Sequence, residues 1–351
     1  MTRVAVVTAR PPTGDDLHAR HARGLALGLA DAGLHVEHLA GDHAVAPRLW
    51  ETVRQRARAF DVVHVLGIRA LPAVFAAHGR TRAVVVSPLS GPGPISALRR
   101  LLNMPSGRAS RALLEMADRI ICATPAESER MGQIVPRAGS RMRVVPLGID
   151  TASVRMAEPL PGAAKKLVAL SGPGRGHHLN RVVAALADLS TSFELVIAGP
   201  CPHTRQITAE AAQLDVLDRV HFLGMLDDRA LHRWLRTACV VVSLSERWTS
   251  PQVLLAALAA GTPIVVGEAA NLDAVDDAHA AGVTVVPRDV SPLALADALA
   301  DAARVRLSPA AAPGLPTIED EITGLLEVYA ELVELPEAVQ AAWSAEARQA
   351  S

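Results

Sequence analysis

The stretch SERWTSPQVLLAALAAG, residues 245–261, lies between two apolar runs that are typical of buried strands. A turn from a strand into a helix leaves unpaired backbone amides at the helix N-terminus, and such amides bind anions. We expect this helix to begin at Pro251 and to end at Gly261. The residues that we expect to meet a ligand at this turn are Glu246, Trp248, Thr249, Ser250 and Gln252.

A second glycine-rich stretch, SGPGRGHHLNR at residues 171–181, follows another apolar run. Its glycines allow the backbone to approach a phosphate closely, and Arg175 adds a permanent positive charge. The alternative is a flexible loop whose histidines are solvated. The residues that we expect to bind an anion here are Gly172, Gly174, Arg175, His177 and His178.

Polar residues also follow the apolar runs of the N-terminal half. Asp15 and Asp16 stand where a first helix should begin, so they either cap that helix or receive a cationic ligand. His64 lies at the end of the run DVVHVL, where a lone histidine is either a substrate contact or a structural residue. The ligand contacts that we expect in this half are Gly14, Asp15, Asp16, His64, Ser87 and Ser90.

Composition and charge exclude several classes of function. The 351 residues carry a formal net charge of -1, which provides no basic surface for nucleic acid or anionic membranes. The three cysteines, Cys122, Cys201 and Cys239, form no CxxC pair and are expected to be reduced. The short apolar run after Met1 is too short for a signal peptide or a spanning helix. We therefore expect a cytoplasmic protein without integral membrane contact.

Short β-branched runs alternate with segments of helical periodicity, which is typical of parallel sheets covered by helices on both faces. The pattern is interrupted at TASVRMAEPLPGAAKK, residues 151–166, and then starts again. The expected strands of the first half are 4–9, 35–40, 61–66, 82–87, 119–123 and 143–148. Those of the second half are 166–171, 194–199, 219–224, 239–244, 262–267 and 282–287.

This pattern predicts an α/β protein with two Rossmann-like, doubly wound domains that face each other across a cleft. We expect an N-terminal acceptor-side domain at 1–152, a linker at 153–166 and a C-terminal donor domain at 167–330. A helical tail at 331–351, separated by Pro336, should pack back towards the N-terminal domain.

Several of these pieces resemble the retaining glycosyltransferase family of GT-B fold that includes sucrose synthases, phosphatidylinositol mannosyltransferases and the mycothiol glycosyltransferase. The resemblance covers nearly the whole chain, and its specificity comes from the order and spacing of its pieces. They are DVVHVLG (61–67), ADRIICATPAESERM (117–131), RVVPLGID (143–150), FELVIAGP (193–200), VHFLGMLDDRALHRWLRTACVVVSLS (220–245) and LLAALAAGTPIVVGEAANLDAV (254–275).

The resemblance implies transfer of a sugar from a nucleotide-diphosphate donor to a small acceptor, with retention and without metal or cofactor. Gly224 and Met225 would join the donor site. Arg175, His64 and Glu246 would serve catalysis, with Arg175 stabilising the leaving diphosphate. The acceptor side would include Asp15 and Asp16, Ser87 and Ser90, and a homodimer is an open option.

The chain departs from the family at both donor loops. Alignment on Ser245 and Gly261 places Trp248 and Ala256 where relatives carry two glutamates for the sugar and the ribose. Trp248 either faces the sugar or packs inward, and Glu246 either replaces the first lost acid or lies at the surface. In the glycine-rich loop Pro173 holds the place of an arginine, and His177 or His178 the place of a lysine.

Three hypotheses follow from the sequence. The first is a glycosyltransferase with a remodelled donor turn, in a natural-product or small-thiol pathway. The second is a catalytically silent homologue that acts as a binding subunit for a partner. The third is another two-domain Rossmann-type enzyme, such as a sugar-nucleotide epimerase; the chain lacks the GxGxxG of dinucleotide enzymes.

Overall fold

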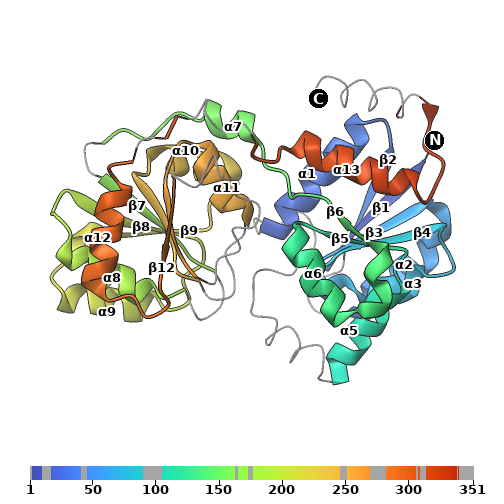
Figure 1. Ribbon diagram of the computed structural model, residues 1–351, viewed down its shortest axis with the longest axis horizontal. Helices are drawn as coiled ribbons and strands as arrows, with labels where there is room; N and C mark the ends of the chain where they lie inside the picture. Colours follow the sequence, from blue (N-terminus) through green and yellow to red (C-terminus); the bar gives the residue numbers. More distant parts are fainter. Residues whose placement is uncertain are drawn as a thin grey trace. The chain divides into compact units, whose positions relative to one another are not determined.

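The computed structural model describes residues 2–9, 17–40, 46–89, 105–162, 165–172, 177–245, 251–268, 282–305, 307–308, 314–337 and 339. These residues form two compact units (Figure 1). The first unit contains the described residues up to 148 together with those from 316 onward, and the second contains residues 149–315.

The first unit is built on a parallel sheet of six strands, in the order β2-β1-β3-β4-β5-β6. All six strands expected from the sequence are present. They are β1 (Arg3–Thr8), β2 (His35–Ala40), β3 (Val62–Leu66), β4 (Ala83–Ser87), β5 (Arg119–Cys122) and β6 (Met142–Val144).

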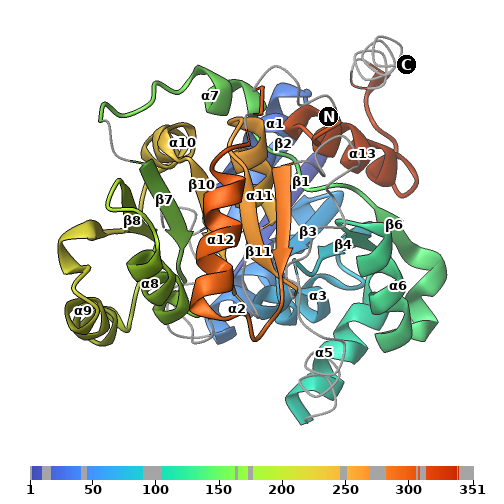
Figure 2. The same cartoon turned by 60° about the vertical axis from the view of Figure 1, so that its left-hand side comes forward.

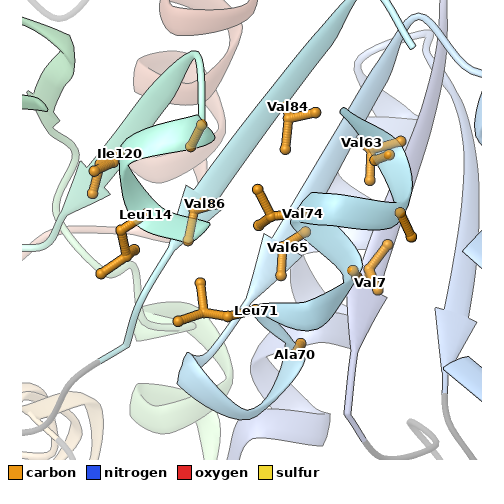
Figure 3. Packing of buried hydrophobic residues seen from close by; sticks show 14 of the residues in the cluster. Val7, Val63, Val65, Ala70, Leu71, Val74, Val84, Val86, Leu114 and Ile120 are labelled. Atoms are coloured by element: carbon orange, nitrogen blue, oxygen red, sulfur yellow. The ribbon is translucent and has the colours of Figure 1, made fainter. Parts of the chain in front are cut away.

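Helices cover both faces of this sheet, because both faces of its central strands are apolar. One face packs against α2 (Ala46–Arg56), α3 (Pro72–Ala77), α5 (Pro105–Met116) and α6 (Pro125–Ile134). Figure 3 shows this core, in which Val63 and Val65 of β3 meet Leu71 and Val74 at α3. The other face packs against α1 (Leu17–Asp31) and α13 (Ile318–Ala330).

The second unit repeats the plan with the strand order β12-β11-β10-β7-β8-β9. Its six strands again match the expected runs. They are β7 (Lys165–Leu170), β8 (Phe193–Ala198), β9 (Val220–Gly224), β10 (Val240–Ser243), β11 (Ile264–Gly267) and β12 (Val283–Val286).

The helices of the second unit also form two layers (Figure 2). One layer consists of α8 (Leu179–Asp188), α9 (Thr204–Gln213) and α12 (Pro292–Ala302). The other consists of α7 (Thr151–Met156), α10 (Asp228–Thr237) and α11 (Pro251–Ala259). Short 3-10 helices span Ala57–Ala59, Ile68–Ala70, Pro136–Arg141 and Leu217–Arg219.

The structure divides the chain differently from the expected domains. Residues 153–166 were expected as a linker, but α7 belongs to the second unit because Val154 is fully buried in its core. Helix α13 was expected in the C-terminal domain, yet it packs on the first sheet and completes the core of the first unit. The Gly148 amide donates a hydrogen bond of 2.8 Å to Glu321, which holds α13 at this boundary.

Segments beyond α13 also contact the first unit. Val333, Leu335 and Val339 are buried in the same core as β1 and α1. The Thr2 hydroxyl donates to the Glu334 carbonyl oxygen at 3.1 Å. The remainder of the expected tail, 340–351, lies outside the described residues.

Candidate active site

Each sheet has one position where the strand order reverses, and open α/β sheets bind ligands at the carboxyl ends of the strands there. In the first sheet this position lies between β1 and β3, and in the second between β7 and β10. The two loops that we expected to bind an anion follow β7 and β10, which pair directly. The topology therefore brings Gly172 and Ser245 to the same edge of the second sheet.

The carboxyl ends of β7, β8 and β9 are tied together by hydrogen bonds to backbone carbonyl oxygens. The Ser171 hydroxyl donates to the Pro200 carbonyl oxygen at 2.9 Å. Gly199 has a φ of 108°, and a Cβ there would lie 2.2 Å from the Ser171 carbonyl oxygen, so only glycine fits. The Gly199 amide in turn donates to Gly224. Met225, which follows, is exposed, and its expected contact with a donor stays a prediction.

The helix after β10 begins and ends as expected. Helix α11 starts at Pro251 and is closed by Gly261, whose φ is 78° and whose amide donates to the Leu258 carbonyl oxygen. Gln252 lies in its first turn, half-buried. Glu246, Trp248, Thr249 and Ser250 lie outside the described residues.

Ala256, which the alignment on Ser245 and Gly261 places at the position of the ribose-binding acid of relatives, lies on α11 inside an apolar core. Its exposed fraction is 6%, and its neighbours in that core include Leu255 and Leu258. A methyl group makes no hydrogen bond. Any hydroxyl of a ligand near this position must therefore find another partner.

The alignment places His177 or His178 where relatives carry a lysine, and His177 does not provide a fixed positive charge. Its ring lies against Gly172, where a Cβ would stand 2.8 Å from the ring atoms Cε1 and Nε2. Burial, together with the charge of His178, lowers the pKa of His177, so the ring is neutral near pH 7. His178 has a left-handed backbone, with φ 49°, and precedes α8. Gly174 and Arg175 lie outside the described residues.

His64 occupies a different environment from the substrate contact that we expected. It is completely buried, its Nδ1 lies 2.7 Å from the Tyr329 hydroxyl, and its Nε2 lies 2.8 Å from the Ser87 hydroxyl. Burial, and then the charge of His21, lower the pKa of His64 to about 3. With both ring nitrogens occupied, His64 joins β3 to β4 and α13, and in this structure it has no free edge for a substrate.

Ser87, at the end of β4, is 6% exposed, and its hydroxyl contacts His64. The expectation that Ser87 contacts an acceptor stays a prediction. The other expected acceptor contacts, Gly14, Asp15, Asp16 and Ser90, lie outside the described residues.

The sequence reading missed the partners of His64. Tyr329 is the one tyrosine of the chain and is fully buried on α13. Nearby, His21 of α1 and Glu321 of α13 approach to 3.3 Å, and burial raises the pKa of Glu321. The sequence did contain a signal for such partners, namely His64 as the single polar residue of the apolar strand VVHVL. A buried imidazole requires hydrogen-bond partners.

Within the described part of the chain, no group of three or more histidine, cysteine, aspartate or glutamate residues could hold a metal ion. No helix in the same residues is long and apolar enough to cross a membrane.

Two family models match the chain, one in each half. The model described as Glycosyltransferase Family 4 matches residues 3–153, and the one described as Glycosyl transferases group 1 matches residues 174–304.

Curated relatives show partial similarity. A D-inositol 3-phosphate glycosyltransferase of Xylanimonas cellulosilytica is 29% identical over 262 residues, which are 65% of this chain and 60% of that protein. An alpha-monoglucosyldiacylglycerol synthase of Streptococcus pneumoniae is 26% identical over 171 residues, which are 44% of this chain and 38% of that protein. The chain thus matches less than two thirds of the length of these relatives.

Solved structures share the fold at low identity. HepE of Anabaena, in complex with UDP-glucose, has a TM-score of 0.74 at 14% identity and covers 94% of this chain and all of its own. Sucrose-phosphate synthase of Thermosynechococcus elongatus has a TM-score of 0.70 at 19% identity, with 99% of both chains covered. The two halves of the chain thus each match a glycosyltransferase family model, and its two six-stranded parallel sheets share the GT-B fold of these solved structures.

Proposed function

We propose that the protein transfers a sugar, with retention, from a nucleotide-diphosphate donor to a small acceptor in a natural-product or small-thiol pathway. The observation that carries this proposal is the pairing of β7 with β10 at the reversal point of a sheet matched to a glycosyltransferase family. Relatives named as a glycosyltransferase and as a glucolipid synthase, and a structural neighbour solved with UDP-glucose, support this chemistry.

The donor diphosphate would lie at the N-terminus of α11. The backbone amides of the turn before Pro251 would donate to it, and the helix dipole would favour its negative charge. Arg175 would stabilise the diphosphate as it leaves, while the diphosphate itself takes the proton of the acceptor on the same face of the sugar. This scheme needs no protein nucleophile and no metal ion.

The donor would be bound with fewer carboxylate contacts than in relatives. The buried methyl group of Ala256 supports this point, because it leaves a ribose hydroxyl without an acid at that position. Trp248 would face the sugar and favour a deoxygenated or otherwise less polar one, since an aromatic face packs on C–H surface. Asp15 and Asp16 would receive the acceptor, which would then carry a positive charge.

A calorimetric titration with UDP-, GDP- and dTDP-sugars tests the proposal. Ser250→Pro removes one amide of the turn and should weaken donor binding by about 1 to 3 kcal/mol, because a buried phosphate oxygen then lacks a donor. Ser250→Ala keeps the amide and is the matched control. Binding of no nucleotide by the folded wild-type protein would contradict the proposal and would favour the silent binding subunit instead.

A further inference from the structure

The side chains behind the end of β4 form a chain of hydrogen bonds on the α13 face of the first sheet. His64 is in register with Val85, and Ser87 lies two residues beyond Val85 on the same face. The Ser87 carbonyl oxygen accepts a hydrogen bond of 2.8 Å from the Gly67 amide, which fixes the backbone there. Ser87 is therefore nearer than His64 to the carboxyl edge of the sheet, where a ligand would approach.

This chain of hydrogen bonds can run in two directions. The hydroxyl groups of Tyr329 and Ser87 can each donate or accept, whereas a neutral imidazole has one N–H and one lone pair. If Tyr329 donates to Nδ1 of His64, then Nε2 carries the proton and donates to Ser87, and the proton of Ser87 is left over. In the reverse direction Ser87 donates to Nε2, Nδ1 donates to Tyr329, and the proton of Tyr329 is left over.

Burial decides between the two directions. Tyr329 has an exposed fraction of 0%, and among the described residues its hydroxyl has one hydrogen-bond partner, Nδ1 of His64. The neighbouring carboxylate of Glu321 contacts His21 instead. A left-over proton on Tyr329 would thus be buried without an acceptor, which is costly. Ser87 is 6% exposed at the end of its strand and can offer its proton to a group outside the sheet, so the chain runs from Tyr329 to Ser87.

The charge states of the two rings agree with this direction. Burial, and then the charge of Glu321, raise the pKa of Tyr329, so the phenol keeps its proton and remains a donor. The lowered pKa of His64 keeps the imidazole neutral, with one N–H. Because the hydrogen bond at one ring nitrogen sets which nitrogen carries the proton, Tyr329 sets the tautomer of His64.

We propose that His64 and Tyr329 are positioning residues that hold the Ser87 hydroxyl as a hydrogen-bond donor, directed towards an oxygen atom of the acceptor substrate. The identity of the ligand rests on the proposed glycosyl transfer, whereas the direction of the chain rests on the contacts and burial of these three residues. Because β3, β4 and α13 orient the hydroxyl before the acceptor binds, the cost of ordering it is removed from binding.

Nitrogen NMR of the full-length protein, labelled with ¹⁵N-histidine, tests the direction of the chain and needs no substrate. The signals of His64 are assigned by their absence from His64→Gln, and a ring nitrogen that carries a proton is distinguished from one that does not. Near neutral pH the wild type should show His64 as the Nε2–H tautomer alone. The Nδ1–H tautomer, or a mixture of the two, would overturn the proposal.

Two variants separate the roles of the hydroxyl groups. In Tyr329→Phe the donor to Nδ1 is gone and Ser87 can turn its proton inward, so the Nδ1–H tautomer should appear beside the Nε2–H tautomer. Ser87→Ala leaves Tyr329 in place and should keep the Nε2–H tautomer. Thr262→Val removes a buried hydroxyl of the second unit and is the control, which should leave the signals of His64 as in the wild type. The wild-type tautomer alone in Tyr329→Phe would show that Tyr329 does not position the ring.

Initial rates of transfer from UDP-, GDP- and dTDP-glucose to glucosamine test the role of the hydroxyl. Glucosamine is a small hydroxylated probe with the positive charge proposed for the acceptor. Ser87→Ala should raise the KM for glucosamine by about tenfold and Tyr329→Phe by about threefold, with the KM for the donor unchanged, because a hydrogen bond to the acceptor is lost or weakened. Ser87→Thr keeps the hydroxyl and should have the KM of the wild type.

An unchanged KM for glucosamine in both Ser87→Ala and Tyr329→Phe would overturn the role of the hydroxyl. Absence of transfer by the wild type would contradict the acceptor contact together with the proposed function. The tautomer of His64 would still decide the direction of the chain, so the two failures are distinguishable.

Discussion

His64 and His177 are both buried at the sheets of their units, yet their surroundings differ. His64 lies within β3, and both ring nitrogens contact hydroxyl groups, those of Tyr329 and Ser87. His177 follows β7, lines a cavity, and leaves Nδ1 without a partner among the described residues. In both, burial lowers the pKa, so the two rings share a charge state near neutral pH and differ in their partners.

The difference separates a histidine whose two ring nitrogens both have hydrogen-bond partners from one whose Nδ1 has none among the described residues. Removal of a satisfied group leaves its partners unpaired, whereas removal of an unsatisfied group leaves none. The two residues should therefore respond to substitution in opposite ways, which makes the comparison testable.

The largest effect is expected for His64→Ala. This variant leaves a cavity in the core and two hydroxyl groups without their imidazole partner, and it should lower the free energy of unfolding by about 3 to 5 kcal/mol. Urea unfolding followed by circular dichroism, with hydrogen exchange in β3, measures the loss. His78→Ala, at an exposed position after α3, should change stability by less than about 0.5 kcal/mol. A similar small loss for His64→Ala would mean that the network contributes nothing.

Tyr329→Phe should give a smaller loss, of about 1 to 3 kcal/mol, because the ring still packs while Nδ1 of His64 loses its partner. The same urea experiment reports it. In the double variant with His64→Ala the two losses should be less than additive, since both remove one contact. Strict additivity would show that the 2.7 Å contact carries no energy.

The network also predicts a dependence of stability on pH. The pKa of His64 is lowered from its ordinary value of 6.5 to about 3, so between these values the unfolded chain binds a proton that the folded chain does not. The contribution of neutral His64 to the free energy of unfolding is complete above pH 6.5 and is lost as the pH falls towards 3. Its slope is at most about 1.4 kcal/mol per pH unit. Between pH 3 and 6.5 the free energy of unfolding should depend more steeply on pH for the wild type than for His64→Ala. An equal dependence on pH in the two proteins would contradict the lowered pKa of His64.

The smallest effect is expected for His177→Phe. A flat apolar ring can lie on Gly172 as the imidazole does, and it removes a buried atom that has no described partner. The free energy of unfolding should change by less than about 1 kcal/mol. A loss as large as that of His64→Ala would show that Nδ1 is satisfied in the folded protein and would remove the distinction between the two histidines.

The sequence predicted both sheets because their strands are buried on both faces and so read as nearly continuous β-branched runs. VVHVL of β3 and the IVVG run of β11 are examples. The limits of α11 were also predictable, since Pro251 and Gly261 have restricted roles at helix ends.

Contacts between distant segments were not predictable from local patterns. Nothing in the periodicity of IEDEITGLLEVYA indicates that α13 returns to the first sheet, because the same amphipathic helix could cover either sheet. The environment of His64 depends on Tyr329, which is 265 residues away in the chain. The cavity at His177 likewise needs the loop after β8, whose Cys201 and His203 carried no motif.

The return of α13 has a consequence for the order in which the chain folds during synthesis. The described residues of the second unit all lie within the stretch 149–315, so its core residues have left the ribosome before α13 emerges. The first unit cannot complete its core until α13 has been synthesised, because Ile322, Leu325 and Tyr329 cover one face of a sheet whose strands are made earlier. Until then the valines of β1 and β3 on that face, with His64 among them, are exposed to water and to chaperones.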